Sequence, residues 1–276
     1  MTTLSLGYSP CPNDTYIFHA LIHGLIPCGD LDFKERLEDV ETLNQLALQG
    51  ALDLTKISFH AFGHLRDRYV LLRSGAALGR GCGPLIVADE SLSLDQLKGK
   101  IIAIPGQLTT ANLLLQLYVG GTDKLLILPF NQIIDAVRQG RAAAGVIIHE
   151  SRFTYQQYGL KKMLDLGQWW EEETGHPIPL GGILAKRSLG EERIRQVDQA
   201  LRSSIDYARN HPQEAISYIR QHAQELDDAV IRQHIDLYVN DYSIDLGEDG
   251  LAAIHCLLDK AEQVGIIATS DLPLTI

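Results

Sequence analysis

His149 stands directly after an apolar run, residues 146–148, and is followed by Glu150. An imidazole with an ordinary pKa near 6.5 can accept a proton at neutral pH, and a positioned general base contributes about 10²- to 10⁴-fold in rate. A histidine at the exit of a buried strand therefore suits proton abstraction. A histidine packed at a strand end and bonded to the backbone is the alternative, and spacing alone leaves both open.

Two further groups of polar side chains suit recognition of a carboxylate. Lys56 interrupts an apolar strand end and is soon followed by Ser58, so an ammonium and a hydroxyl can face one pocket. Thr109 and Thr110 open a helical segment, and the hydroxyls and free N–H groups at a helix start bind anions. A solvated lysine and a plain helix cap are the alternatives at these positions.

Metal and nucleotide chemistry find little support in the sequence. His60 and His64 have helical spacing but lack a nearby third ligand, and no H-E-x-x-H motif occurs. Neither a G-x-G-x-x-G fingerprint nor a phosphate-binding G-x-x-x-x-G-K-[ST] loop is present. We therefore expect no metal and no other cofactor.

An α/β scaffold is needed to bring these side chains together. Short apolar runs alternate with segments of helical period through the first two thirds of the chain, which predicts βαβ units and a largely parallel sheet. Strands are expected at residues 4–8, 31–37, 52–57 and 69–73. After residue 189 only helical patterns follow, and these helices are expected to pack on the first lobe.

Two lobes are predicted from the position of a glycine-rich stretch, residues 75–83, before the strand-like residues 85–87. The stretch suits either a flexible connector or direct ligand contact. We place the first lobe at residues 1–86 and 187–276, and the second at residues 87–186, with a return strand through residues 182–185. Two crossings imply a two-segment hinge, which lets lobes close around a ligand.

A short internal repeat, which we call the internal echo, indicates where the cleft lies. Gln49-Gly50 leads into the strand that ends at Ser58, and Gln139-Gly140 leads into the strand before His149. Aligning the two glycines sets Phe59 opposite His149. Because ligands of parallel α/β sheets bind beyond the carboxyl ends of the strands, both strand ends should face one crevice.

Bulk composition excludes several classes of partner. The 276 residues carry a formal net charge of -11, which opposes binding to nucleic acid or to an anionic membrane. No signal peptide and no membrane-spanning run is evident, and four well-separated cysteines resemble neither a disulfide framework nor a zinc site. The expectation is a soluble, cytoplasmic protein that takes a small-molecule carboxylate; a homodimer is left open.

Several long blocks of the sequence resemble one family, the 1,4-dihydroxy-6-naphthoate synthases of the futalosine route to menaquinone. The blocks are residues 9–15 (SPCPNDT), 37–44 (LEDVETLN), 55–58 (TKIS), 74–81 (SGAALGRG) and 147–155 (IIHESRFTY). They run from the end of the first strand into the second lobe, and the similarity continues through the C-terminal helices. Residues 94–106 also resemble the opening of the second lobe in solute-binding proteins of the periplasmic type II class.

The resemblance implies a lyase on a type II periplasmic-binding-protein-like fold. It would convert cyclic de-hypoxanthine futalosine to 1,4-dihydroxy-6-naphthoate without a metal or organic cofactor, and His149 would be the proton acceptor. Substrate-binding positions carried over from the family are Lys56, Ile57, Ser58, Thr109, Thr110 and Asn44. Leu108 departs from the family, which has a polar or basic residue there, so the contacts beside Thr109 are in doubt.

Two rival functions stay open at this point. Chorismate dehydratase of the same pathway shares the fold and also acts on a carboxylate without a cofactor. A solute-binding protein that feeds a transporter is the rival of a different class. The block around His149 favours the naphthoate synthase over the first rival, and the missing export signal disfavours the second. Whether Glu150 or Arg152 tunes His149 is left undecided.

Overall fold

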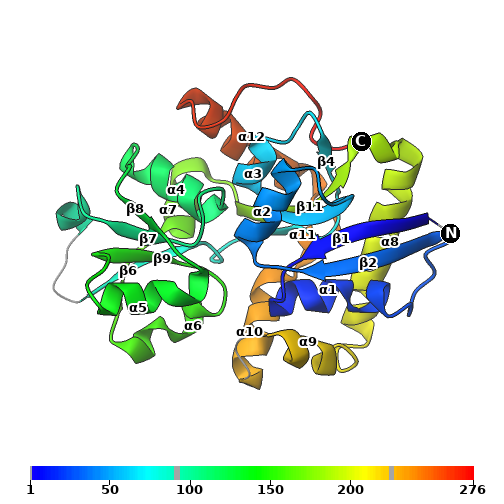
Figure 1. Cartoon of the computed structure of the whole chain (residues 1–276), viewed down its shortest axis with the longest axis horizontal. Coiled ribbons are helices and arrows are strands. Elements are labelled where there is room, and N and C mark those ends of the chain that lie inside the picture. Colours follow the sequence, from blue (N-terminus) through cyan, green and yellow to red (C-terminus); the bar gives the residue numbers. More distant parts are fainter. Residues whose placement is uncertain (1, 90–93, 224–226) are drawn as a thin grey trace.

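Short apolar runs of the chain form two separate β-sheets (Figure 1). The computed structural model describes residues 2–89, 94–223 and 227–276. The strands of the first sheet are β1 (Thr2–Tyr8), β2 (Leu31–Leu37), β3 (Leu54–Ser58), β4 (Tyr69–Leu71), β5 (Ala77–Gly79) and β11 (Ile178–Lys186). Those of the second are β6 (Leu85–Ala88), β7 (Ile102–Ile104), β8 (Leu125–Ile127), β9 (Ala144–Ile147) and β10 (Lys161–Asp165).

Both sheets are mixed, with a parallel part and an antiparallel part. The first has the order β2-β1-β3-β11-β4, and β5 pairs with β11; the second has the order β10-β6-β9-β7-β8. Strands β1 to β3 are parallel, as are β7 to β9, whereas β11 and β6 run antiparallel to their neighbours. The expectation of largely parallel sheets is therefore wrong for the strands beside each crossing. The reason is that β3 ends at the cleft, whereas β11 starts there as the chain returns.

Helices flank both sheets. In the first lobe they are α1 (Pro12–Ile22), α2 (Val40–Leu48), α3 (Phe59–Gly63), α8 (Glu191–Asn210), α9 (Ile216–His222), α10 (Asp228–Tyr238), α11 (Asp241–Ile244) and α12 (Gly247–Gln263). In the second lobe they are α4 (Thr110–Val119), α5 (Ile133–Arg138), α6 (Ser151–Thr154) and α7 (Leu166–Thr174). Short 3₁₀ turns occupy η1 (Leu94–Leu97), η2 (Phe130–Gln132), η3 (Tyr155–Tyr158) and η4 (Arg187–Leu189). The predicted C-terminal helices are confirmed, and α8 and α10 pack with α1 on the first lobe (Figure 1).

The point at which the chain returns to the first sheet differs from the expected one. Strand β11 pairs with β3, β4 and β5, so the change of sheet falls between β10 and β11, before Ile178. The sequence-based boundary after residue 186 places that strand in the second lobe. The outward crossing, between β5 and β6, lies close to its expected position. The exact domain division stays a prediction.

Alternation along the strands separates the cores on the two faces of each sheet. Ile183 of β11 joins a cluster with α1 and α8, whereas its neighbour Leu184 joins a cluster on the other face. This follows from the two-residue period of a strand. In the second lobe, Ile147 packs toward α5, whereas Val146 faces the other way.

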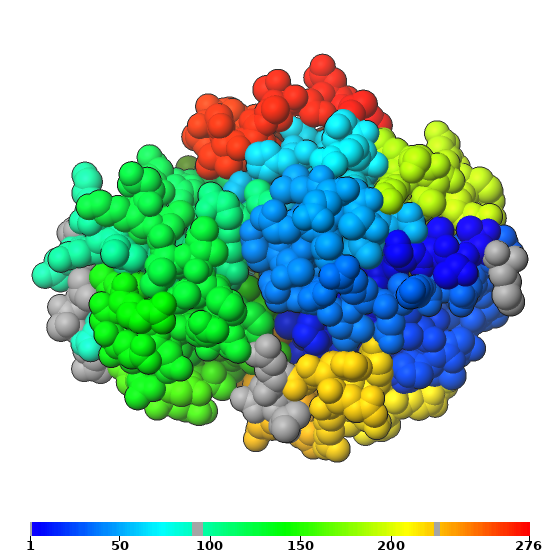
Figure 2. All heavy atoms as spheres, viewed as in Figure 1, coloured from blue at the N-terminus to red at the C-terminus, as the bar shows by residue number. Residues whose placement is uncertain are grey.

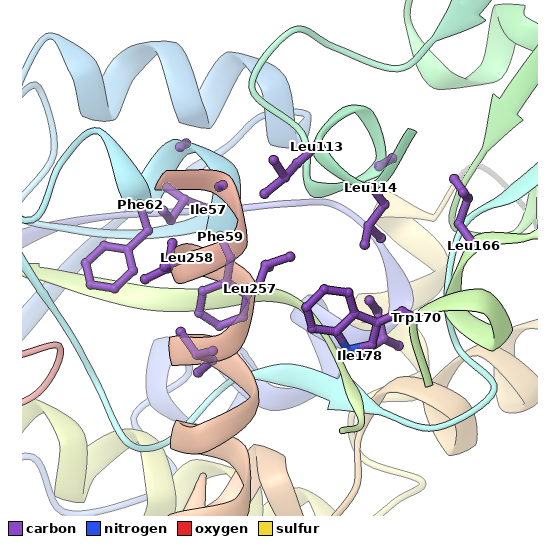
Figure 3. Packing of buried hydrophobic residues seen from close by; sticks show 14 of the residues in the cluster. Ile57, Phe59, Phe62, Leu113, Leu114, Leu166, Trp170, Ile178, Leu257 and Leu258 are labelled. Atoms are coloured by element: carbon purple, nitrogen blue, oxygen red, sulfur yellow. The ribbon is translucent and has the colours of Figure 1, made fainter. Parts of the chain in front are cut away.

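One of these clusters is continuous across both lobes. Ile57 and Phe59 from the first lobe lie in the same cluster as Leu113 and Trp170 from the second, with Leu257 of α12 between them (Figure 3). The two lobes therefore share a hydrophobic core on one side of the molecule.

The outward crossing is held by an arginine. The Arg152 guanidinium donates to the carbonyl oxygens of Gly81 (2.8 Å) and Gly83, and forms an ion pair with Asp165 at 2.9 Å. A Cβ on Gly83 would lie 2.3 Å from the Cα of Gly167, so the two backbones pass with no room for a side chain. Arg152 thus fixes the crossing.

Candidate active site

The predicted site residues meet in a cleft between the lobes. Lys56, Ile57, Ser58, Thr109, Thr110 and His149 all line it, together with apolar side chains such as Val40, Ile148 and Leu180. Its empty space, including the opening to solvent, is about 660 Å³. In the space-filling view the second lobe abuts the first along a narrow seam (Figure 2).

The cleft lies where the internal echo predicts. Gly50 and Gly140 both have left-handed φ angles, 65° and 70°, and each ends the helix before its strand. Ser58 closes β3 and Ile148 follows β9, and both side chains line the cleft. Equivalent strand ends of the two lobes thus face each other across it.

His149 has an unusual backbone conformation. Its φ of 55° is positive, which is true of no other non-glycine residue in the ranges the structure describes. The left-handed region costs an L-residue roughly 1–2 kcal/mol, and such strain persists where the surroundings enforce it. Here the chain leaves β9 and turns at once into α6, with Arg152 N–H bonded to the His149 carbonyl oxygen at 3.2 Å. The turn presents the ring to the cleft.

The ring of His149 is held neutral. Burial lowers its pKa to about 4; Asp14 and Asp39 oppose that shift, and Lys56 reinforces it. The imidazole packs edge-on against Phe130, with ring centroids 5.0 Å apart. At neutral pH the side chain therefore keeps a free lone pair, as a proton acceptor requires.

Lys56 is already paired with a carboxylate of the protein. Its Nζ lies 3.1 Å from Oδ1 of Asp14 and donates to the Gly75 carbonyl oxygen at 3.3 Å. Asp14 also accepts from the backbone N–H and the hydroxyl of Ser9, at 3.1 and 2.7 Å. Both ions are buried, so the pair brings no net charge to the wall of the cleft.

Asn44 lies behind the cleft wall. It is fully buried, accepts from the Ser58 backbone N–H at 3.0 Å, and donates to the Ser58 hydroxyl at 3.2 Å. The cleft-lining residues do not include it. Its contacts hold Ser58 in place; the substrate contact that the resemblance implies for Asn44 stays a prediction.

The start of α4 closes the cleft from the second lobe. Thr109 caps the helix by accepting from the Asn112 N–H at 3.2 Å. Thr110 accepts from the Phe59 N–H at 3.0 Å and donates to the Leu180 carbonyl oxygen at 2.5 Å, which ties α4 to the first sheet. The Leu108 N–H donates to Glu41 at 3.1 Å. The lobes are therefore in direct contact at this edge.

Several residues of the site received no role from the sequence. Cys11 is the N-cap residue of α1 and Asp14 lies in its first turn; the signal for Asp14 was a polar side chain close to the apolar Tyr16 to Phe18. His234 of α10 lies 6.1 Å from His149 between ring centroids, nearly parallel to it. Its Nε2 lies 2.9 Å from Asn13 Oδ1. In the part of the chain that the structure describes, its Nδ1 has no hydrogen-bond partner.

The His60–His64 pair does not belong to a three-ligand cluster in the described part of the chain. Among the described residues, one group of three side chains has metal-ligand spacing, Cys11, His149 and Glu150, and neither member of the pair belongs to it. His60 instead lies with Nδ1 3.3 Å from the Thr109 carbonyl oxygen. No helix in the described ranges is long and apolar enough to cross a membrane.

Comparisons with known proteins agree on one family. The family model described as "Menaquinone biosynthesis" matches residues 4–263. A protein of Thermus thermophilus is 53% identical over 274 residues, 99% of both chains, and one of Streptomyces coelicolor is 45% identical over 270 residues, 96% of this chain and 95% of that one. Both are named 1,4-dihydroxy-6-naphthoate synthase.

Solved structures give the fold. A crystal structure of an Archaeoglobus fulgidus protein superimposes with a TM-score of 0.90 at 39% identity, covering 96% of this chain and 98% of the other. A Candida albicans protein with the generic periplasmic binding protein fold gives 0.67 at 18% identity, with 98% and 92% covered. An alkanesulfonate-binding protein of Xanthomonas axonopodis gives 0.72 at 16%, with 98% and 95% covered. The expected two-lobed periplasmic-binding-protein-like fold is confirmed.

Proposed function

This chain belongs to the menaquinone biosynthesis family, whose matching relatives are enzymes, and from that premise we propose that it converts cyclic de-hypoxanthine futalosine to 1,4-dihydroxy-6-naphthoate with His149 as the general base. The observation that carries the base assignment is the imidazole itself. It is neutral, it stands on a left-handed turn at the end of β9, and it faces the cleft between the lobes.

Proton abstraction starts the proposed reaction. The His149 lone pair takes an acidic proton of the substrate. The electron pair left behind forms a new π bond as the carbon–carbon bond breaks, and the carbon that keeps the bonding pair is protonated by the His149 imidazolium. Aromatisation of the product supplies driving force, so the protein has mainly to hold the base near the proton and keep water out. The apolar lining from Val40, Ile148 and Leu180 serves the second purpose.

The substrate carboxylate is assigned to the first turn of α4. Lys56 is matched by Asp14 at 3.1 Å, so it adds little net attraction. Thr109 and Thr110, at the start of the ten-residue helix α4, line the cleft together with Ser58, and the positive end of a helix dipole attracts an anion. At this end the Glu41 carboxylate accepts from the preceding Leu108 N–H. Lys56 then acts by holding the first turn of α1 at Asp14.

A cytoplasmic location is part of the proposal. All four cysteines are free thiols, and reduced thiols are typical of that compartment. Relatives named for a biosynthetic step fit the same location.

Product analysis tests the function directly. Incubation of the purified protein with cyclic de-hypoxanthine futalosine, followed by mass spectrometry, is expected to show 1,4-dihydroxy-6-naphthoate. A solute-binding protein would return the compound unchanged. A chorismate dehydratase would leave it unchanged too, but would dehydrate chorismate in a parallel incubation. Either result would contradict the proposal.

A further inference from the structure

We propose that Cys11, His149 and Glu150 form a binding site for one zinc-class divalent cation, and that the cation bridges the two lobes. A thiol sulfur, an imidazole nitrogen and a carboxylate oxygen, one from each residue, all lie within 4.8 Å of one another. Ligand atoms around tetrahedral zinc are separated by roughly 3.5 Å, given bond lengths of about 2.0–2.3 Å. Small side-chain shifts thus suffice for all three to reach one ion.

The backbone holds each ligand in place from a different side. Cys11 is the N-cap residue of α1, between two prolines, and its carbonyl oxygen accepts from the Asp14 and Thr15 N–H groups at 3.1 Å each. His149 and Glu150 follow β9 in the second lobe, with His149 fixed in the left-handed turn. Cys11 and Glu150 are only 4% and 6% exposed. The backbone therefore holds the three ligands close together, with His149 on the cleft wall and Cys11 and Glu150 buried beside it.

The three donor types select the metal. Magnesium and calcium prefer sets made only of oxygen, whereas a sulfur, a nitrogen and an oxygen together suit zinc or the similar cobalt(II) ion. Three protein ligands leave a fourth position for water or another small ligand. On binding, the Cys11 S–H bond breaks, a sulfur–metal bond forms, and the proton passes to solvent. The ion's two positive charges are then balanced by the thiolate and the carboxylate.

Occupation of this site would switch the enzyme off. The ion takes the His149 lone pair that the proposed reaction needs, and it ties the loop before α1 to the end of β9, which holds the lobes together. The inhibition rests on the function proposed above, whereas metal binding does not. Zinc would act here as a reversible inhibitor.

A cobalt titration tests the binding without using turnover. The reduced full-length protein is titrated with Co²⁺ under anaerobic conditions, and the thiolate-to-cobalt charge-transfer band is followed. One equivalent is expected to saturate the band. Cys11→Ser should remove it and weaken the affinity at least about 100-fold, since losing a ligand exceeds the cost of losing an outer-shell partner. Cys82→Ser is the matched control, because Cys82 is the other buried thiol near the cleft, and it should keep the band.

Glu150→Gln provides a second variant from the opposite lobe. It keeps shape and removes one anionic ligand, so it should retain the band but lower its affinity by about 10- to 100-fold. The absence of any band in the wild-type protein, or a band that survives Cys11→Ser, would overturn the site. If Co²⁺ and Zn²⁺ bind as expected but zinc leaves turnover of the wild-type enzyme unchanged, the metal site stands and the base role of His149 is refuted.

Discussion

The two strand ends that face the cleft occupy equivalent positions in their lobes, but their side chains differ in chemistry. At the end of β3, Lys56 is paired with Asp14, Ser58 bonds to Asn44, and the backbone is regular. At the end of β9, His149 has a strained φ and a free lone pair. One end is a fixed wall whose polar groups are matched, and the other carries the reactive group. Substitutions at the first should therefore act mainly on stability, and substitutions at the second on catalysis.

The sharpest test of this contrast is removal of the base. His149→Asn should lower kcat by about 10²- to 10⁴-fold, because a positioned base acts in the transition state. KM should change only a few-fold, which steady-state kinetics will resolve. His64→Asn, an exposed histidine of the first lobe, should behave like the wild type. A His149→Asn enzyme within tenfold of wild-type kcat would break the comparison.

At the β3 end the expected loss is in stability. Lys56→Met leaves the Asp14 carboxylate buried without its cation, which should cost about 3–5 kcal/mol in the free energy of unfolding measured with urea. The double variant Lys56→Met with Asp14→Asn removes the orphaned charge and should recover part of that loss. A Lys56→Met variant with the wild-type free energy of unfolding would show that the Lys56–Asp14 pair does not stabilise this end of β3.

Lowering the pH should reduce activity by protonating His149 at the end of β9. Because the pKa of His149 is lowered to about 4, the base stays neutral well below the ordinary 6.5. The pH profile of kcat/KM should then fall on the acid side with a midpoint near 4. The same depressed pKa makes this histidine's contribution to stability complete above pH 6.5 and progressively lost as the pH falls toward 4. A midpoint near 6.5 would contradict both statements.

The smallest effect isolates the backbone strain. His149→Gly and His149→Ala both lose the ring, but only glycine adopts a φ of 55° without cost. The glycine variant should be more stable than the alanine variant by about 1 kcal/mol. Thermal unfolding of both proteins measures the difference. Equal melting temperatures would mean that the left-handed turn is not strained.

Local patterns were sufficient to predict most elements and the place of the cleft. Apolar runs marked β1 to β4, and the repeated Gln-Gly before β3 and β9 located the two strand ends. Contacts between residues that only the tertiary structure brings together could not be predicted from the sequence. Nothing in the spacing of Asp14 and Lys56 reveals that they pair at 3.1 Å, and this pair changes how the substrate carboxylate is expected to bind.

The sequence also did not show to which sheet β11 belongs, for a related reason. Residues 178–186 form an apolar strand in either sheet, and only long-range pairing with β3 assigns them to the first. Cys11 likewise offered no signal as a lone cysteine, since its neighbours at the site lie in the other lobe.

The hydrophobic cluster that runs from Phe59 through Leu257 to Trp170 has a thermodynamic consequence. Neither half of the chain can melt without exposing apolar surface of the other, so heating should produce a single cooperative transition. In scanning calorimetry the measured enthalpy should equal the van't Hoff enthalpy. Two resolved peaks would mean that each half is stable by itself.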